Sequence, residues 1–181
     1  MKRGFEIIGT FADKEINIPT RATKHAAGYD FEAAKDVRIP SIWKNGIRSG
    51  WETLKTFPRV VITAPPETKT NSVVGVKPTL VPTGVKAYMQ EDEFLQLANR
   101  SGNPLKRFLL LANGVGVIDA DYYNNADNEG HIMFQFINFG LSTVEIKKGE
   151  RIGQGIFLPF LKADNDVSET ERTSGFGSTG K

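Results

Sequence analysis

Short apolar runs separated by turn residues recur along most of the chain. The runs read GFEIIG, YDFEAA, RVVIT, TLVPTGVKAYM, FLLLAN, HIMFQFIN, TVEIKK and IGQGIFLPF. Each is short enough for one strand, and 18 glycines and 9 prolines punctuate the chain. No run sustains an apolar period of 3.6 residues. The pattern predicts an all-β fold, a sandwich, barrel or jelly roll built from many short strands.

Two segments also admit a helix. Residues 91–99, EDEFLQLAN, fit either a strand or a helical turn, since Phe94, Leu95 and Leu97 suit both periods. Residues 103–107 are a second candidate for a short helix. Neither segment changes the predicted class.

Two further segments differ in amino-acid composition from the strand-rich remainder. Residues 41–72 hold both tryptophans, several lysines and a Pro-Pro turn, which indicates an insertion on the sheet scaffold. Residues 163–181 are polar and rich in Gly, Ser and Thr, which is typical of a mobile terminal arm. We therefore expect one domain over residues 1–181, with an insertion and a C-terminal arm.

Composition narrows the function classes. A chain of 181 residues with 39% hydrophobic content can bury one core. Its formal net charge of +2 gives no global field for nucleic acid or a membrane surface. The absence of cysteine excludes disulfides, thiolate metal sites and a cysteine nucleophile. With no apolar run of signal-peptide or membrane-spanning length, we expect a cytoplasmic protein.

Two segments combine glycines with polar and aromatic residues in patterns that suit a nucleotide. Residues 111–124, LANGVGVIDADYYN, allow close backbone approach to a flat ligand, or simply form a tight hairpin with solvated aspartates. Residues 172–181, RTSGFGSTGK, offer amides and Arg172 to an anion and Phe176 to a base, or are a linker.

Three other segments carry single polar candidates. Asp30 in AAGYDFEAA could bind Mg²⁺ directly or through water, or be a turn carboxylate. Arg100 and Ser101 in NRSGNP could contact phosphate. Gln154 in GERIGQGIF is either a ligand contact or a satisfied core amide. The two histidines lack zinc-ligand spacing, and no G-x-S-x-G is present.

Taken together, the five segments resemble the five motifs that define the trimeric dUTPases, in order and in wording. The matching segments are PTRATKHAAGYDFEAA, NRSG, NGVGVIDADY, GERIGQGIF and RTSGFGSTG. The resemblance implies a distorted jelly-roll or β-barrel fold, a homotrimer with shared active sites, and Mg²⁺-dependent hydrolysis of dUTP. The products would be dUMP and diphosphate, formed by water attack on the α-phosphate.

The resemblance also assigns roles to individual residues. Asp119 would activate the water, Asp30 would hold Mg²⁺ through water, and Tyr122 would lie against the deoxyribose. The uracil would be recognised by residues of the third motif, namely Asn113, Gly116 and Ile118. A neighbouring subunit would contact the phosphates through the second and fourth motifs, by Arg100, Ser101, Gly102 and Gln154. A third chain would close over the nucleotide with its arm, through Arg172, Phe176, Gly177, Ser178 and Thr179.

The chain departs from plain family members in three places. Gly102 stands where many members have a second serine, residues 41–72 lengthen the first half, and YYNNADNEGH lengthens the hairpin after Tyr122. Such extended members resemble those of bacteriophages of Gram-positive hosts, some of which bind repressor proteins. A repressor partner for the insertion, and the host cytoplasm as location, follow as expectations.

Two alternatives remain, one a second enzyme and the other a protein of another class. A dCTP deaminase shares the fold and an I-D-x-x-Y hairpin, but HIMFQFIN lacks the glutamate that such an enzyme needs. A non-catalytic module that binds nucleotide and a protein partner is opposed by the joint presence of Asp30, Asp119 and Tyr122.

Overall fold

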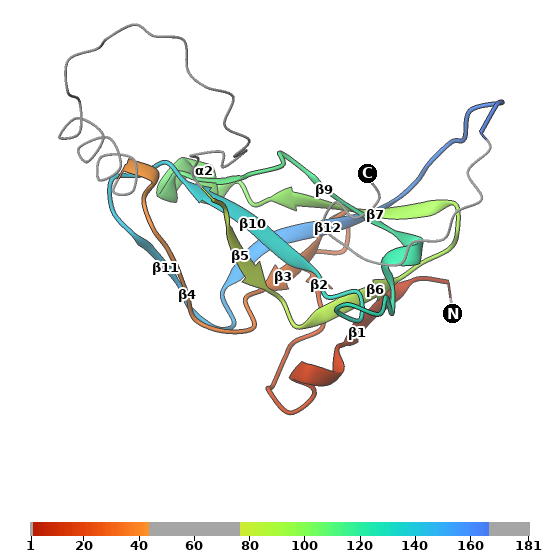
Figure 1. Cartoon of the computed structure of the whole chain (residues 1–181), viewed down its shortest axis with the longest axis horizontal. Coiled ribbons are helices and arrows are strands. Elements are labelled where there is room, and N and C mark those ends of the chain that lie inside the picture. The colour runs from red at the N-terminus through yellow and green to blue at the C-terminus, as the bar shows by residue number, and fades with distance from the viewer. Residues whose placement is uncertain (1, 44–76, 167–181) are drawn as a thin grey trace, which may run out of the picture.

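The computed structural model describes residues 2–43 and 77–166, which form a mostly β structure (Figure 1). In its first half the strands are β1 (Gly4–Ile7), β2 (Thr20–Arg21), β3 (Tyr29–Glu32), β4 (Val37–Ile39), β5 (Thr79–Pro82) and β6 (Val85–Tyr88). In its second half they are β7 (Glu93–Asn99), β8 (Leu109–Leu111), β9 (Gly116–Asp119), β10 (Met133–Asn138), β11 (Val144–Ile146) and β12 (Arg151–Pro159). The helical elements are η1 (Gly9–Phe11), α2 (Gly102–Arg107) and η2 (Ala120–Tyr122).

The strands form two principal antiparallel sheets. The larger has the order β2-β3-β12-β7-β9, and the smaller has the order β5-β10-β8. Strand pairs β1-β6 and β11-β4 complete the described part of the fold. Strand β10 crosses β12 in Figure 1, and the Phe134 ring of β10 lies directly against Gly153 of β12, so the two sheets pack face to face. The predicted all-β class is confirmed.

An aromatic layer fills the space between these sheets. The rings of Phe31 on β3 and Phe134 on β10 lie 5.6 Å apart, and Phe136 stacks on Phe134 at 6.2 Å. All three are essentially inaccessible to solvent. Burying one such side chain stabilises the fold by roughly 1.5–3 kcal/mol. A Cβ atom at Gly153 of β12 would overlap the Phe134 ring, so only glycine permits this approach of the sheets.

The structure decides whether each of the two candidate segments is a helix. Residues 93–99 form β7, in which Glu93, Leu95 and Leu97 are buried at alternate positions, so the helical alternative for this segment is wrong. The second candidate is a helix, α2. It ends at Phe108, whose left-handed backbone (φ 54°) lets its N–H donate to the Asn103 carbonyl.

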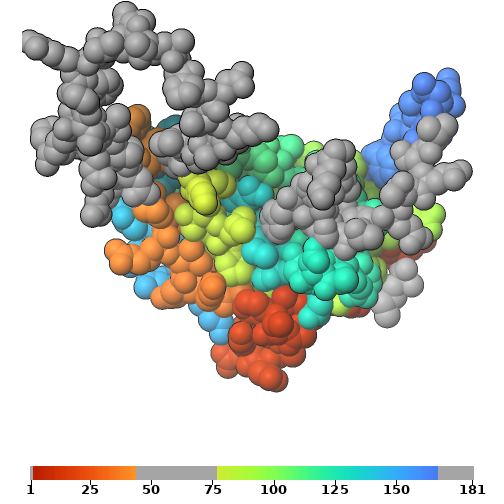
Figure 2. All heavy atoms as spheres, viewed as in Figure 1, coloured from red at the N-terminus to blue at the C-terminus, as the bar shows by residue number. Residues whose placement is uncertain are grey.

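The predicted insertion and arm lie largely outside the described residues, since residues 44–76 and 167–181 are not described. Where the insertion begins, Ser41 Oγ donates to the Gly140 carbonyl at 2.6 Å. Trp43 Nε1 donates to the Phe139 carbonyl at 2.9 Å. The chain after β12 projects from the body (Figure 2), and Leu161 on it is 97% exposed. Within the two described ranges, no helix is long and apolar enough to cross a membrane.

His131 is a buried titratable group that holds a tight turn. Its side chain is 7% exposed, and its Nε2 accepts a hydrogen bond from the N–H of Gly84 at 3.0 Å. Accepting this bond requires the neutral ring. Burial lowers the pKa of His131 to about 4, Glu129 opposes the shift, and Lys35 adds to it.

His131 should therefore make stability depend on pH. The unfolded chain takes up this proton below about pH 6.5, whereas the folded chain resists it down to about 4. The contribution is complete above pH 6.5 and is lost as the pH falls toward 4, by up to roughly 3 kcal/mol. Urea unfolding of the wild type and His131→Gln across pH 4–7 measures this. We expect a shallower pH dependence in the variant; parallel curves would contradict the assignment.

Candidate functional site

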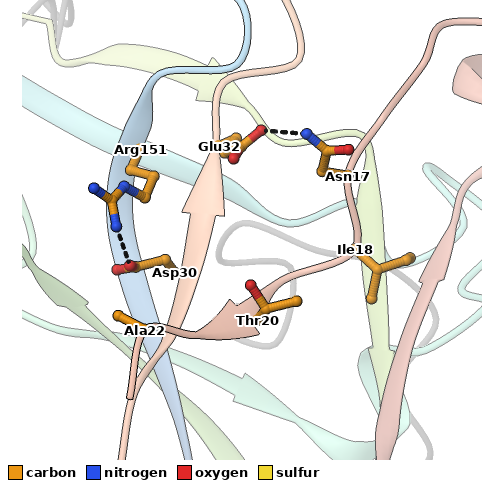
Figure 3. Close-up of a pocket in the computed structure, with 7 residues that line it drawn as sticks. All are labelled: Asn17, Ile18, Thr20, Ala22, Asp30, Glu32 and Arg151. Atoms are coloured by element: carbon orange, nitrogen blue, oxygen red, sulfur yellow. Dashed lines mark hydrogen bonds and ion pairs between the residues drawn. The ribbon is translucent and has the colours of Figure 1, made fainter. Parts of the chain in front are cut away.

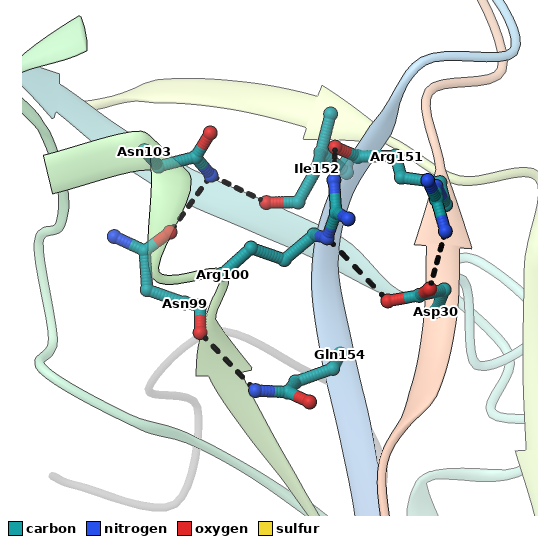
Figure 4. A network of polar contacts seen from close by, with 7 residues as sticks. All are labelled: Asp30, Asn99, Arg100, Asn103, Arg151, Ile152 and Gln154. Atoms are coloured by element: carbon teal, nitrogen blue, oxygen red, sulfur yellow. Dashed lines mark hydrogen bonds and ion pairs between the residues drawn. The ribbon is translucent and has the colours of Figure 1, made fainter. Parts of the chain in front are cut away.

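Two arginines surround the carboxylate of Asp30 on β3 (Figure 4). Asp30 Oδ1 lies 3.5 Å from Arg100 Nε, and Oδ2 accepts a hydrogen bond from Arg151 Nη1 at 3.1 Å. Among these three side chains, one carboxylate neutralises only one of the two guanidinium groups, and the next carboxylate on β3, Glu32, instead accepts a hydrogen bond from Asn17. Such groups, each partly exposed, suit the binding of a phosphate.

The turn between β7 and α2 places Arg100 at this cluster. Asn103 is 5% exposed, and its Nδ2 donates to Asn99 Oδ1 and to the Ile152 carbonyl, both at 2.8 Å. These bonds tie the turn to β12, where Arg100 Nη1 also donates to the Arg151 carbonyl at 3.1 Å. The buried amide therefore fixes the position from which Arg100 extends.

The other second-motif residues follow directly in α2. Ser101 is exposed at the N-cap, and its side chain makes no cap hydrogen bond. Gly102 is the first helical residue, and no atom lies within 4 Å of a Cβ built there. A serine would fit this position without a clash.

A bulge in β12 places its polar side chains on one face. Arg151 pairs with Glu32 and Gly153 with Phe31, so β12 has one residue more than β3 across this step. Ile152 is consequently buried in the core, while Arg151 and Gln154 both lie on the face of Asp30. Arg151 is a site residue that the sequence analysis does not predict, because strict alternation would put it opposite Gln154.

Gln154 is oriented by its neighbours on this face. Its Nε2 donates to the Asn99 carbonyl at 3.4 Å, and a Cβ at Gly28 would overlap its Oε1. Glycine at position 28 thus leaves room for the amide beside Asp30. Arg151 and Asp30 also line a cavity of about 440 Å³ together with Glu32, which accepts a hydrogen bond from Asn17 (Figure 3).

The third-motif segment forms a tight turn that joins β8 of the smaller sheet to β9 of the larger one. The two strands pair with β10 and β7 and not with each other, so the predicted hairpin is not formed. Gly114 adopts a left-handed conformation (φ 69°), and the N–H of Val115 donates to the Asn113 carbonyl at 2.7 Å. Asn113 is exposed at this turn. Gly116 pairs with Leu97, and a Cβ there would lie 3.1 Å from the Leu97 side chain. Ile118 packs against the core.

Asp119 and Tyr122 follow this turn, Asp119 beside a cavity and Tyr122 in a buried position. Asp119 ends β9 and lines a cavity of about 730 Å³ together with Asp121. Tyr122 is 4% exposed, and its hydroxyl donates to the His131 carbonyl at 3.1 Å. The hydroxyl also accepts a hydrogen bond from Asn128 Nδ2 at 2.9 Å.

Within a single chain, Asp119 lies far from the Asp30 cluster. Asp119 pairs with Phe94 near the start of β7, whereas Arg100 follows the end of that strand. Six residues of extended chain correspond to about 20 Å. The structure therefore joins Asp30, Arg100 and Gln154, but it does not bring Asp119 to them. The predicted arm residues lie outside the described chain: Arg172, Phe176, Gly177, Ser178 and Thr179.

The donor set around Asp30 fits Mg²⁺ only if the ion brings other ligands. Over residues 2–43 and 77–166, no three His, Asp or Glu side chains are grouped as a metal site. Mg²⁺ usually keeps several waters and takes phosphate oxygens as ligands. A single carboxylate beside a cluster whose arginines suit a phosphate is compatible with that mode.

Comparisons with known proteins agree with one another. Residues 67–180 match the family model described as dUTPase. The deoxyuridine 5′-triphosphate nucleotidohydrolase of Lactococcus lactis is 47% identical, with 98% of this chain and 97% of that protein covered. The crystal structure of dUTPase from Streptococcus mutans is 41% identical, covers 90% of this chain and 99% of that chain, and has a TM-score of 0.67.

A solved dUTPase from phage phi11 of Staphylococcus aureus is more distant. It is 16% identical, covers 96% of this chain and 100% of that chain, and has a TM-score of 0.62. At this identity the likeness extends to the fold alone.

Asn103→Ala should destabilise the folded chain. The substitution leaves the buried Ile152 carbonyl without this donor, at a cost of about 1–3 kcal/mol. Thermal unfolding measures the loss, with Lys106→Ala on the exposed side of the same helix as a control near the wild type. Equal melting of the two variants would show that the Asn103 amide does not hold the turn.

Proposed function

The chain belongs to the dUTPase family, and on this premise we propose that it hydrolyses dUTP to dUMP and diphosphate by water attack on the α-phosphate. Its enzyme class is therefore that of a dUTP diphosphatase. The structural observation that carries the proposal is the pair of arginines held around Asp30, with Gln154 beside them. This face offers cationic and amide donors to a polyphosphate.

We assign the water-activating role to Asp119. Hydrolysis at phosphorus depends mainly on alignment and charge neutralisation, with one acceptor placed to receive the proton of the attacking water. Asp119 supplies a carboxylate in a cavity large enough for a ligand, at the rigid end of a paired strand. The turn and strand that lead to Asp119 also carry the residues assigned to the uracil, Asn113, Gly116 and Ile118.

We assign phosphate binding to Arg100, Ser101 and Gln154, and the structure adds Arg151 to this set. Asp30 holds both guanidinium groups in place, which lowers the entropy lost when they bind a ligand. The arm residues Arg172, Phe176, Gly177, Ser178 and Thr179 remain assigned to closure over the nucleotide, on the motif alone.

Magnesium is part of the proposal, because dUTPases generally use it. Asp30 would hold the ion through a water molecule, and the ion would arrive with the triphosphate. When bound, Mg²⁺ supplies neutralisation of negative charge on the phosphate oxygens.

We further propose that each site is shared between chains of a homotrimer. The separation of about 20 Å between the strand positions beside Asp119 and Arg100 is too large for both side chains to serve one phosphate group. Apolar residues on β8, on β9 and in the turn between them are exposed in the single chain, namely Leu110, Val115 and Val117. A closed cyclic trimer would bury such a surface and complete three sites.

The expected phage origin and repressor partner receive no support from the comparisons. Phage dUTPase structures matching this chain are 15% to 19% identical, and they establish fold alone. The relatives at 47% and 41% identity come from Lactococcus lactis and Streptococcus mutans. Repressor binding through residues 41–72 stays a prediction from the sequence.

Asp119→Asn tests the proposed reaction. The amide occupies the same space but cannot accept the proton of the water, so kcat should fall by roughly 100-fold or more while dUTP still binds. Diphosphate release from dUTP, measured with and without Mg²⁺, reads out turnover, and dUTP titration reads out binding. Near-normal turnover in the variant would remove Asp119 from the mechanism. No diphosphate from the wild type would overturn the proposed activity.

Mixed oligomers test whether the site is shared. Asp119→Asn and Arg100→Ala should each be nearly inactive alone. Refolded together, they should regain roughly a quarter of wild-type activity, since random mixing pairs the two intact residues in that fraction of sites. Absence of any recovery in trimers shown to be mixed would place both residues of a site in one chain.

A further inference from the structure

Asparagine side chains make hydrogen bonds within the loop of residues 123–131, which follows Tyr122. Asn125 Oδ1 accepts hydrogen bonds from the N–H groups of Asp127 and Asn128, at 3.1 and 3.2 Å. Asn128 Oδ1 accepts from the N–H of Gly130 at 3.1 Å and from Asn125 Nδ2 at 2.9 Å. The two amides thus add to the loop's own backbone bonds, in which the N–H of Asn124 donates to the Glu129 carbonyl at 3.2 Å and the N–H of Glu129 donates to the Asn125 carbonyl at 3.0 Å.

The same amides reach Tyr122 at both ends of the residue. Asn125 Nδ2 donates to the Tyr122 carbonyl at 2.9 Å, and Asn128 Nδ2 donates to its hydroxyl at 2.9 Å. The hydroxyl in turn donates to the His131 carbonyl at 3.1 Å. A phenol held by one donor and one acceptor has a single well-defined position.

The loop is itself fastened to the body of the protein. Tyr123 donates its hydroxyl to Glu6 on β1 at 2.6 Å. The N–H of Gly9 in η1 donates to Glu129 at 2.9 Å, and Lys86 on β6 contacts Asn124. Three separate elements therefore support the loop, and through Asn128 they support Tyr122.

We propose that Asn128 is a positioning residue for sugar specificity. By holding the Tyr122 hydroxyl, it fixes the ring whose position decides whether a ribose 2′-hydroxyl fits. This rests on the proposed function, in which Tyr122 lies against the deoxyribose. A side chain excludes one hydroxyl group only if it cannot yield by about 1 Å, because a displacement of that size would relieve the overlap. The amide donor of Asn128 supplies that resistance.

Selectivity between dUTP and UTP tests the proposal from both ends of this hydrogen bond. Asn128→Ala removes the donor, and Tyr122→Phe removes the hydroxyl while leaving the loop's own asparagine bonds in place. Each should raise kcat/KM for UTP relative to dUTP by roughly 3- to 10-fold, the factor associated with losing one neutral hydrogen bond. The ratio is independent of the fraction of folded enzyme, so partial unfolding cannot imitate the effect.

Tyr123→Phe is the matched control. It removes a hydroxyl from the same loop, but one bonded to Glu6 and not to Tyr122. The ratio should stay at the wild-type value. In the Tyr122→Phe background, Asn128→Ala should add little, because its target hydroxyl is already absent. A shift with Tyr123→Phe as large as with Asn128→Ala would mean general loosening of the loop and would overturn the proposal.

Tyr122→Ala separates failure of this inference from failure of the role assigned to Tyr122. An unchanged ratio in Tyr122→Ala would show that the ring does not exclude the 2′-hydroxyl, which removes the premise. A raised ratio in Tyr122→Ala with unchanged ratios in Asn128→Ala and Tyr122→Phe would overturn only the role of Asn128.

Discussion

The close approach of β12 to the ring layer above it determines the geometry of the rest of the structure. Gly153 lies under Phe134, and a Cβ at Gly155 would lie 2.7 Å from the ring of Phe31. Since neither position has room for a side chain, the aromatic rings set the spacing between the sheets. Strand β12 can then pair with β3 on one side and β7 on the other, which joins segments far apart in sequence.

The opposite face of β12 carries the phosphate-binding candidates, so core packing and site geometry depend on the same strand. The bulge at Ile152 sends that side chain into the core and leaves Arg151 and Gln154 beside Asp30. Partly exposed ion pairs such as these contribute only about 0–1 kcal/mol to stability. Their arrangement is better explained by the positive surface that they offer to an anionic ligand than by stability.

Side-chain hydrogen bonds support the segment that carries Asp119 and Tyr122. Its turn is tightened by Gly114, and the loop beyond it is closed by Asn125 and Asn128. These polar contacts compensate for the lack of regular strand pairing over residues 123–131. The distance of about 20 Å along β7 between Asp119 and the Asp30 cluster supports the proposal that a second copy completes each site.

The sequence by itself determined the β class, the tight turn at Gly114 and the family, because strand length, turn chemistry and motif wording are local properties. It did not show that this turn joins two sheets and closes no hairpin, because strand pairing is set by distant segments. It left residues 91–99 open, since Phe94, Leu95 and Leu97 fit two periods until pairing with β12 and β9 selects the strand. It could not place Arg151 beside Asp30, because local alternation predicts the opposite face and only the bulge against β3 reverses it. Register and bulges follow from packing between distant segments, and that packing exists only in the folded chain.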